Sequence, residues 1–289
     1  MRAALGRALE RALGSRVARA RPLGGGDINE AWRLSLSDGR EVFAKSNESA
    51  PPGMFAAEAR GLAWLAEAQA LRVPRVLALG DGSEPSADFL VLELIEPGPR
   101  RPEFDEELGR GLAALHRSGA PSFGLDHDNF IGRLPQDNAP RADWEGFYLE
   151  QRLGAQLRRA EAEGRASAAM RRGFERLFER LGELLGPEEP PARLHGDLWG
   201  GNLHVDEEGR PTLIDPAAYG GHREIDLAMM RLFGGFSERC FAAYAEAFPL
   251  AVGHEERVSL YQLYPLMVHV NLFGGGYAGS VERALARYS

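Results

Sequence analysis

The sequence predicts an α+β protein with a small N-terminal lobe, built on an antiparallel sheet and a helix, and a larger, mainly helical C-terminal lobe. Several short runs of alternating apolar and polar residues fall within the first 95 residues, as in half-buried strands. The segment EPGP at 96–99 interrupts them as a linker would. Beyond it, apolar residues recur mostly at helical spacing. We therefore expect an N-terminal lobe at 1–95 and a C-terminal lobe at 96–289.

The N-terminal lobe is predicted to start with a helix, because Leu5, Leu9 and Leu13 recur every four residues. Residues 31–36 and 41–45 alternate on either side of the turn sequence SDGR, which indicates a hairpin. Composition assigns the rest of the lobe as strands at 17–23, 73–79 and 89–95 and a helix at 54–71.

The C-terminal lobe is predicted to be helical apart from one stretch. Helical spacing and helix-favouring residues define segments 104–117, 143–162, 167–185, 225–233, 238–248, 255–271 and 281–286. Residues 194–215 instead have the pattern of short strands joined by loops.

Composition excludes several classes of protein. Apolar residues make up 44% of the chain and charged residues 26%, which is ordinary for a globular protein and not for a disordered one. A net charge of −8 without a basic run argues against nucleic-acid binding. The longest apolar stretch, 263–273, is too short to cross a bilayer. A single cysteine, Cys240, allows no internal disulfide, so we expect a reducing, cytoplasmic location.

Lysine usage singles out one position. All but one of the 34 basic residues are arginine, and the exception is Lys45 at the end of the predicted third strand. Codon bias would explain the arginine excess but not the retained lysine. A compact ammonium differs from a planar guanidinium, so this count leaves a functional role and chance about equally open.

The sequence LHGDLWGGNLHV at 194–205 carries the main chemical motif. Asn202 follows Asp197 by five positions, and Asp215 comes after the next turn, in LIDP. This order matches the catalytic loop and metal ligands of a kinase. Asn202 and Asp215 would offer oxygen ligands to the Mg²⁺ that accompanies ATP, and Asp197 would take the proton of the acceptor hydroxyl.

Phosphate binding would need a strand lysine and a helix carboxylate that orients it. Lys45 and Glu58 suit these roles, and Glu67 is the competing carboxylate. Between the first two strands lies a glycine run that departs from GxGxxG but would let backbone N–H groups approach a phosphate; its members are Gly24, Gly25 and Gly26.

Two simpler interpretations of the motif remain. Asp and Asn favour turns, so Asp197, Asn202 and Asp215 could be turn residues only. His195 and His204 could bind zinc, although no further Cys or His follows at a suitable spacing.

Beyond these kinase motifs, the sequence resembles the fructosamine kinase family, also called ketosamine 3-kinases. The resemblance rests on LHGDLWGGN, on IDPAAYGGHREIDLAMMRLFGGF at 214–236, and on PLGGGDINEAW, DNFIGRLPQDN, WEGFYLEQRL and VNLFGGGY, which span nearly the whole chain. It implies a bilobal protein-kinase-like fold, related to aminoglycoside phosphotransferases and choline kinases. It also implies ATP-dependent phosphorylation of the 3-hydroxyl of ketosamines, such as ribulosamines and fructosamines, which leads to deglycation of amines and proteins.

The resemblance also implies roles for single residues. Asp197 matches the catalytic base, Asn202 and Asp215 the Mg²⁺ ligands, and Lys45 with Glu58 the phosphate-anchoring pair. The segment whose backbone would contact adenine is Glu93, Leu94 and Ile95. Asp226 matches a buried residue that braces the catalytic loop, and His195 would brace the same loop.

Trp199 and His269 are the candidates for contact with the sugar, with core packing as the alternative for each. Some relatives carry a cysteine in the glycine loop that links two subunits. Here Asp27 occupies that stretch, so we expect no disulfide-linked dimer, and the oligomeric state stays open. Other functions to weigh are phosphorylation of another hydroxyl, as in an aminoglycoside or a choline-like alcohol, and a catalytically silent nucleotide-binding module.

Overall fold

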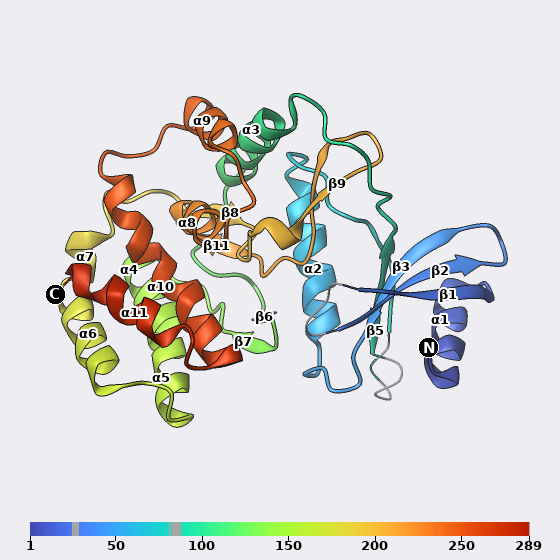
Figure 1. Cartoon of the computed structure of the whole chain (residues 1–289), viewed down its shortest axis with the longest axis horizontal. Helices are drawn as coiled ribbons and strands as arrows, with labels where there is room; N and C mark the ends of the chain where they lie inside the picture. The colour runs from blue at the N-terminus through green and yellow to red at the C-terminus, as the bar shows by residue number, and fades with distance from the viewer. Residues whose placement is uncertain (25–28, 81, 83–87, 289) are drawn as a thin grey trace. The chain divides into compact units, whose positions relative to one another are not determined.

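The computed structural model describes residues 1–24, 29–80, 82 and 88–288 (Figure 1). The chain divides into two compact units. One comprises Met1–Phe104 and Leu203–Pro216, and the other Asp105–Asn202 and Ala217–Ser289. The hairpin that follows Asn202 thus groups with the first unit, whereas the predicted lobes place it in the second. The lobe boundary after residue 95 stays a prediction.

The first unit is organised around a five-stranded antiparallel sheet with the strand order β1-β2-β3-β5-β4. All five strands correspond to predicted ones, and β5 ends at Glu93, before Leu94 and Ile95. The strands are β1 (Val17–Leu23), β2 (Glu30–Leu36), β3 (Glu41–Ser46), β4 (Val76–Leu79) and β5 (Phe89–Glu93).

The two faces of this sheet receive different helices, α1 (Ala3–Leu13) and α2 (Met54–Glu67), which lie on opposite sides of it in Figure 1. The predicted stripe of α1 packs on alternate strand residues, including Val42 and Ala44. Because side chains alternate along a strand, Lys45 points to the other face, toward α2. The alternation of β3 therefore determines which helix Lys45 can meet.

A short hairpin completes the first unit. Its strands β9 (Leu203–Val205) and β10 (Pro211–Leu213) pair antiparallel, with Leu203 opposite Leu213. Asn202 comes directly before the first of these strands and Asp215 two residues after the second. Because Leu203 pairs with Leu213, Asn202 and Asp215 flank the same end of the hairpin although they are thirteen positions apart.

The second unit is mainly helical, as predicted. The long helix α10 contacts α5, α8 and α11 and forms the centre of the packing. The helices are α3 (Phe104–Arg117), α4 (Trp144–Phe147), α5 (Ala155–Ala162), α6 (Ala168–Glu179), α7 (Leu181–Leu184), α8 (Glu224–Phe233), α9 (Glu238–Ala247), α10 (His254–Phe273) and α11 (Ala278–Leu285). Two strand pairs accompany them: β6 (Asn129–Ile131) with β7 (Leu134–Gln136), and β8 (Ala192–Leu194) with β11 (Tyr219–Gly221).

Two predicted helices differ in detail. The expected helix at 143–162 consists of α4, a π-helical stretch at Tyr148–Gly154 and α5. The expected helix at 167–185 is interrupted at Arg180, where α6 ends and α7 begins. Apolar spacing identifies a helical segment but does not reveal how its hydrogen bonds are shifted within it.

Candidate functional site

Lys45 lies in an ion-pair cluster inside the first unit. Its Nζ is 2.9 Å from Oδ1 of Asp215, and it also pairs with the carboxylate of Glu58 on α2. The structure thus brings together three residues that the sequence analysis assigned to phosphate and metal binding. It pairs Lys45 with Glu58, the favoured of the two helix carboxylates.

Charge balance keeps the ammonium of Lys45 protonated. Burial acts to lower the pKa of Lys45, but the nearby carboxylates of Glu58 and Asp215 outweigh it and hold this pKa above its ordinary value. Only 5% of the Lys45 side chain is exposed, whereas 49% of the Asp215 side chain is. A cationic group is therefore fixed in place beside a carboxylate that solvent, and hence a cation, can reach.

In the second unit, Asn202 is attached to the loop that carries Asp197. The Nδ2 group of Asn202 donates to the backbone oxygen of Asp197 at 2.8 Å and to its Oδ2 at 3.2 Å. Its backbone N–H donates to the oxygen of Trp199 at 2.9 Å. Because the amide nitrogen is directed at Asp197, a cation would bind Asn202 through Oδ1. This orientation suits the predicted role of Asn202 as an oxygen ligand.

Asp226, on α8, braces the start of the same loop. Its carboxylate accepts hydrogen bonds from the backbone N–H groups of His195 at 2.8 Å and Gly196 at 2.9 Å. Burial acts to raise the pKa of Asp226, but the hydrogen bond from His116 and the loop N–H groups outweigh it and lower this pKa. The carboxylate therefore stays charged and holds two consecutive backbone groups.

Two further members of this brace were not predicted from the sequence. His116, on α3, lies with Nε2 3.1 Å from Asp226 and Nδ1 2.8 Å from the hydroxyl of Tyr244 on α9. Both residues are buried, each with 1% of its surface exposed. In the sequence both look like core residues of amphipathic helices, because nothing local to either residue reveals the partner.

Glu93 has a structural task of its own in the first unit. Its carboxylate accepts from Arg72 at 2.8 Å and from Arg75 at 2.6 Å, and its backbone N–H donates to the oxygen of Arg75 at 2.9 Å. Arg72 also binds the buried Asp206 of the β9–β10 turn, at 2.8 Å. Of the predicted adenine segment, Leu94 and Ile95 continue beyond the strand.

The two candidate sugar-contact residues differ in environment. Trp199 is 41% exposed, which is unusual for so large an apolar side chain. His269 is partly buried on α10, with Nδ1 2.8 Å from the oxygen of Pro265, and burial lowers its pKa. Its ring contacts those of Phe233 and Tyr277, with centroids 4.5 and 4.9 Å apart. The exposed tryptophan is thus more available to a ligand than the histidine.

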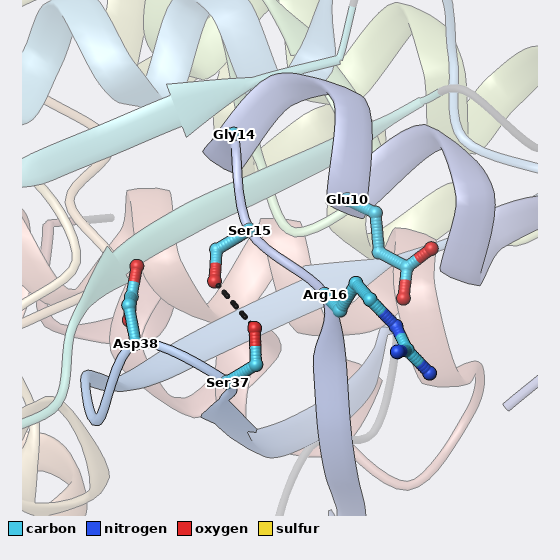
Figure 2. A pocket seen from close by; sticks show the side chains of 6 residues that line it. All are labelled: Glu10, Gly14, Ser15, Arg16, Ser37 and Asp38. Atoms are coloured by element: carbon cyan, nitrogen blue, oxygen red, sulfur yellow. Dashed lines mark hydrogen bonds between the residues drawn. The ribbon is translucent and has the colours of Figure 1, made fainter.

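The glycine run is described only at Gly24, where a side chain would meet nothing within 4 Å. Gly25, Gly26 and Asp27 lie outside the described residues. A surface pocket of about 520 Å³ lies elsewhere in the first unit, at the end of α1. Figure 2 shows its described lining residues, which include none of the predicted site residues: Glu10, Gly14, Ser15, Arg16, Ser37 and Asp38. Its serine hydroxyls lie 3.2 Å apart.

Comparison with known proteins shows the family. The fructosamine kinase family model matches residues 1–289. The chain belongs to the fructosamine kinase family. This confirms the resemblance seen in the sequence.

Individual relatives of this fructosamine kinase family member agree. It is 42% identical to a probable ketoamine kinase of Thermus thermophilus, over 92% of this chain and 93% of that one. It is 38% identical to a chloroplastic protein-ribulosamine 3-kinase of Arabidopsis thaliana, over 92% of this chain and 81% of that one. The crystal structure of a candidate fructosamine-3-kinase from Thermobifida fusca has a TM-score of 0.89 at 40% identity, with 98% and 97% of the two chains covered.

A more distant structure supports the fold. An aminoglycoside phosphotransferase crystallised with AMP-PNP and hygromycin B has a TM-score of 0.64 at 16% identity, with 98% of each chain covered. The predicted fold class, an α+β kinase-like fold, is confirmed. Among the residues with described positions, we find no helix that combines the length and the apolar character needed to cross a membrane.

Proposed function

We propose that this kinase-family protein transfers the γ-phosphoryl group of ATP to the 3-hydroxyl of ketosamines, with ribulosamine and fructosamine adducts as substrates. The phosphorylated adduct would then decompose and release the amine, so the reaction would lead to deglycation of amines and proteins. The observation that carries this proposal is Lys45, a buried lysine whose ammonium pairs with Glu58 and Asp215. The full-length family match supports it.

In this proposal, Lys45 binds phosphate oxygens of ATP, and Glu58 keeps its ammonium in place. The backbone of residues 93–95 would contact adenine, and the glycine run at 24–26 would approach the phosphates. Asn202 and Asp215 would hold Mg²⁺ through oxygen atoms. When bound, Mg²⁺ neutralises the negative charge that builds up on the phosphates.

Asp197 would act on the acceptor. Its carboxylate would orient the sugar hydroxyl and take its proton while the hydroxyl oxygen bonds to the γ-phosphorus and the bond to the leaving ADP oxygen breaks. The brace at Asp226 fixes the backbone of His195 and Gly196, directly before Asp197. Trp199, two residues beyond the base and partly exposed, would contact the sugar; His269 is the second candidate.

Phosphorus NMR with Mg·ATP and ribulosamine, fructosamine, an aminoglycoside or choline would test the proposal. We expect a new phosphate ester on a ketosamine, reduced by about three orders of magnitude in Asp197→Asn. Asp126→Asn, which changes a carboxylate that is 75% exposed, serves as the matched control and should retain activity. Transfer to an aminoglycoside or choline alone would overturn the substrate, and the absence of any transfer would favour a silent nucleotide-binding module.

A further inference from the structure

The segment DNFIGRLPQDN at 128–138 has no role in the chemistry proposed so far. It forms the β6–β7 hairpin and the loop after it, and it contributes three buried amides to the second unit. Asn129, Gln136 and Asn138 are 4%, 1% and 0% exposed. Buried amides need hydrogen-bond partners, so their contacts show what the hairpin holds.

Two of these amides donate hydrogen bonds to the backbone that follows Asp215. Nε2 of Gln136 donates to the oxygen of Ala217 at 3.1 Å, and Nδ2 of Asn129 donates to the oxygen of Ala218 at 2.8 Å. The N–H of Ala217 donates to the oxygen of His195 at 3.0 Å. Both alanines are buried. Three backbone groups directly after Asp215 and Pro216 are thus held by protein atoms.

The orientation of each amide is fixed by a donor behind it. Arg152 has only donors, and its Nη2 binds Oδ1 of Asn138 at 2.7 Å. Nδ2 of Asn138 then binds Oδ1 of Asn129 at 2.9 Å, which directs the Nδ2 of Asn129 to Ala218. The hydroxyl of Tyr264 likewise donates to Oε1 of Gln136 at 2.5 Å, and so directs its Nε2 to Ala217.

The backbone held by these hydrogen bonds follows Asp215, which has an unusual backbone conformation. Asp215 has φ of 52°, in the left-handed region that residues with a side chain rarely adopt, although aspartate does so more often than most. Such a conformation costs about 1–3 kcal/mol and persists only where surrounding contacts enforce it. The hydrogen bonds on Ala217 and Ala218, two and three positions after Asp215, restrain the backbone that follows it.

We propose that Gln136 and Asn129 are positioning residues that keep Asp215 in the backbone conformation in which its carboxylate binds Mg²⁺. The inference rests on the proposed function, in which Asp215 is a metal ligand. Mg²⁺ requires near-ideal octahedral geometry, so a ligand with a relaxed backbone binds it more weakly. Neither amide touches substrate or metal; each acts through the backbone of Ala217 or Ala218.

The test compares two identical substitutions, Gln136→Met and Gln156→Met. Gln156, on α5, is 3% exposed, and its partner is Asn271. The first readout is amide hydrogen exchange of residues 214–220 in nucleotide-free protein, and the second is the Mg²⁺ concentration that gives half-maximal phosphotransfer. In Gln136→Met we expect faster exchange at 214–220 and a Mg²⁺ midpoint raised about tenfold. Gln156→Met should change neither.

Tyr264→Phe is the milder second variant, because it removes only the hydroxyl that orients Gln136. It should shift both readouts in the same direction by less. Exchange at 214–220 equal to that of the Gln156 variant would overturn the inference, and so would an unchanged Mg²⁺ midpoint in an active protein. If wild-type protein shows no Mg²⁺-dependent transfer, the proposed function fails instead, and the exchange data still decide whether the amides hold this backbone.

Discussion

Replacement of the buried ion pair of Lys45 and Glu58 gives the most direct test of how the first unit is stabilised. Lys45→Met removes the ammonium and leaves the buried carboxylate of Glu58 without its partner. A buried charge left alone in this way costs about 3–5 kcal/mol of unfolding free energy. Burial raises the pKa of Glu58 to about 7, so uptake of a proton near neutral pH places the loss at the lower end of this range. Glu58→Gln removes the charge on the other side, while Lys45 keeps the half-exposed Asp215, 2.9 Å away; we expect a loss of about 2 kcal/mol.

A double variant, Lys45→Met/Glu58→Gln, separates the attraction between the two charges from the cost of burying them. At a contact distance of about 3 Å and an effective dielectric constant near 20, two unit charges attract by about 6 kcal/mol, but desolvation offsets most of this. Removal of both charges also removes the desolvation cost. We therefore expect Lys45→Met/Glu58→Gln to be more stable than the sum of the single losses predicts, by about 2 kcal/mol.

Urea unfolding followed by far-ultraviolet circular dichroism would measure the four free energies of this cycle. The exposed pair Arg33 and Glu41, 2.7 Å apart, is the matched control, and its coupling should stay below about 1 kcal/mol. Additive losses from Lys45→Met and Glu58→Gln would refute the reasoning, because the buried charges would then not depend on each other.

Three further predictions concern the second unit. Gly196 has φ of 81°, and a Cβ there would lie 2.1 Å from the oxygen of Ala217, so Gly196→Ala should lower the unfolding free energy by about 3 kcal/mol or more in urea titration. Burial lowers the pKa of His222 from 6.5 to about 4. The folded protein therefore favours the neutral ring of His222. The unfolding free energy is fully retained above pH 6.5 and falls by up to about 3 kcal/mol as the pH drops toward 4. In His222→Gln, the urea midpoint should depend less on pH in this range. Burial raises the pKa of Cys240 to about 12, so the thiol should stay reduced in hydrogen peroxide, and titration with a thiol reagent after unfolding should still find one free thiol; a dimer dissolved by reductant would contradict this.

Local sequence patterns gave the elements because the responsible forces act over a few residues. The four-residue leucine spacing of α1 and the alternation in β2 and β3 reflect a single buried face, which is visible without knowledge of the partner. The same patterns do not reveal the π-helical stretch within 143–162, because apolar spacing changes little when the backbone hydrogen bonds shift by one residue.

The candidate site divides in the same way. The types and spacing of Asp197, Asn202 and Asp215 already indicate oxygen ligands and a base, because the chemistry of phosphoryl transfer demands those groups in that order. The choice of Glu58 over Glu67 as the partner of Lys45 was only favoured by spacing; the packing of α2 on the sheet decides it.

The sequence by itself thus determined the fold class, the family and the residue types of the proposed chemistry, because each is written in short-range spacing or in motifs. Only the tertiary structure revealed the residues that hold those motifs. His116 lies 110 positions from Asp226, and Tyr264 lies 128 positions from Gln136. Such partners are joined by folding alone, and a buried polar side chain carries no local mark of the distant group that satisfies it.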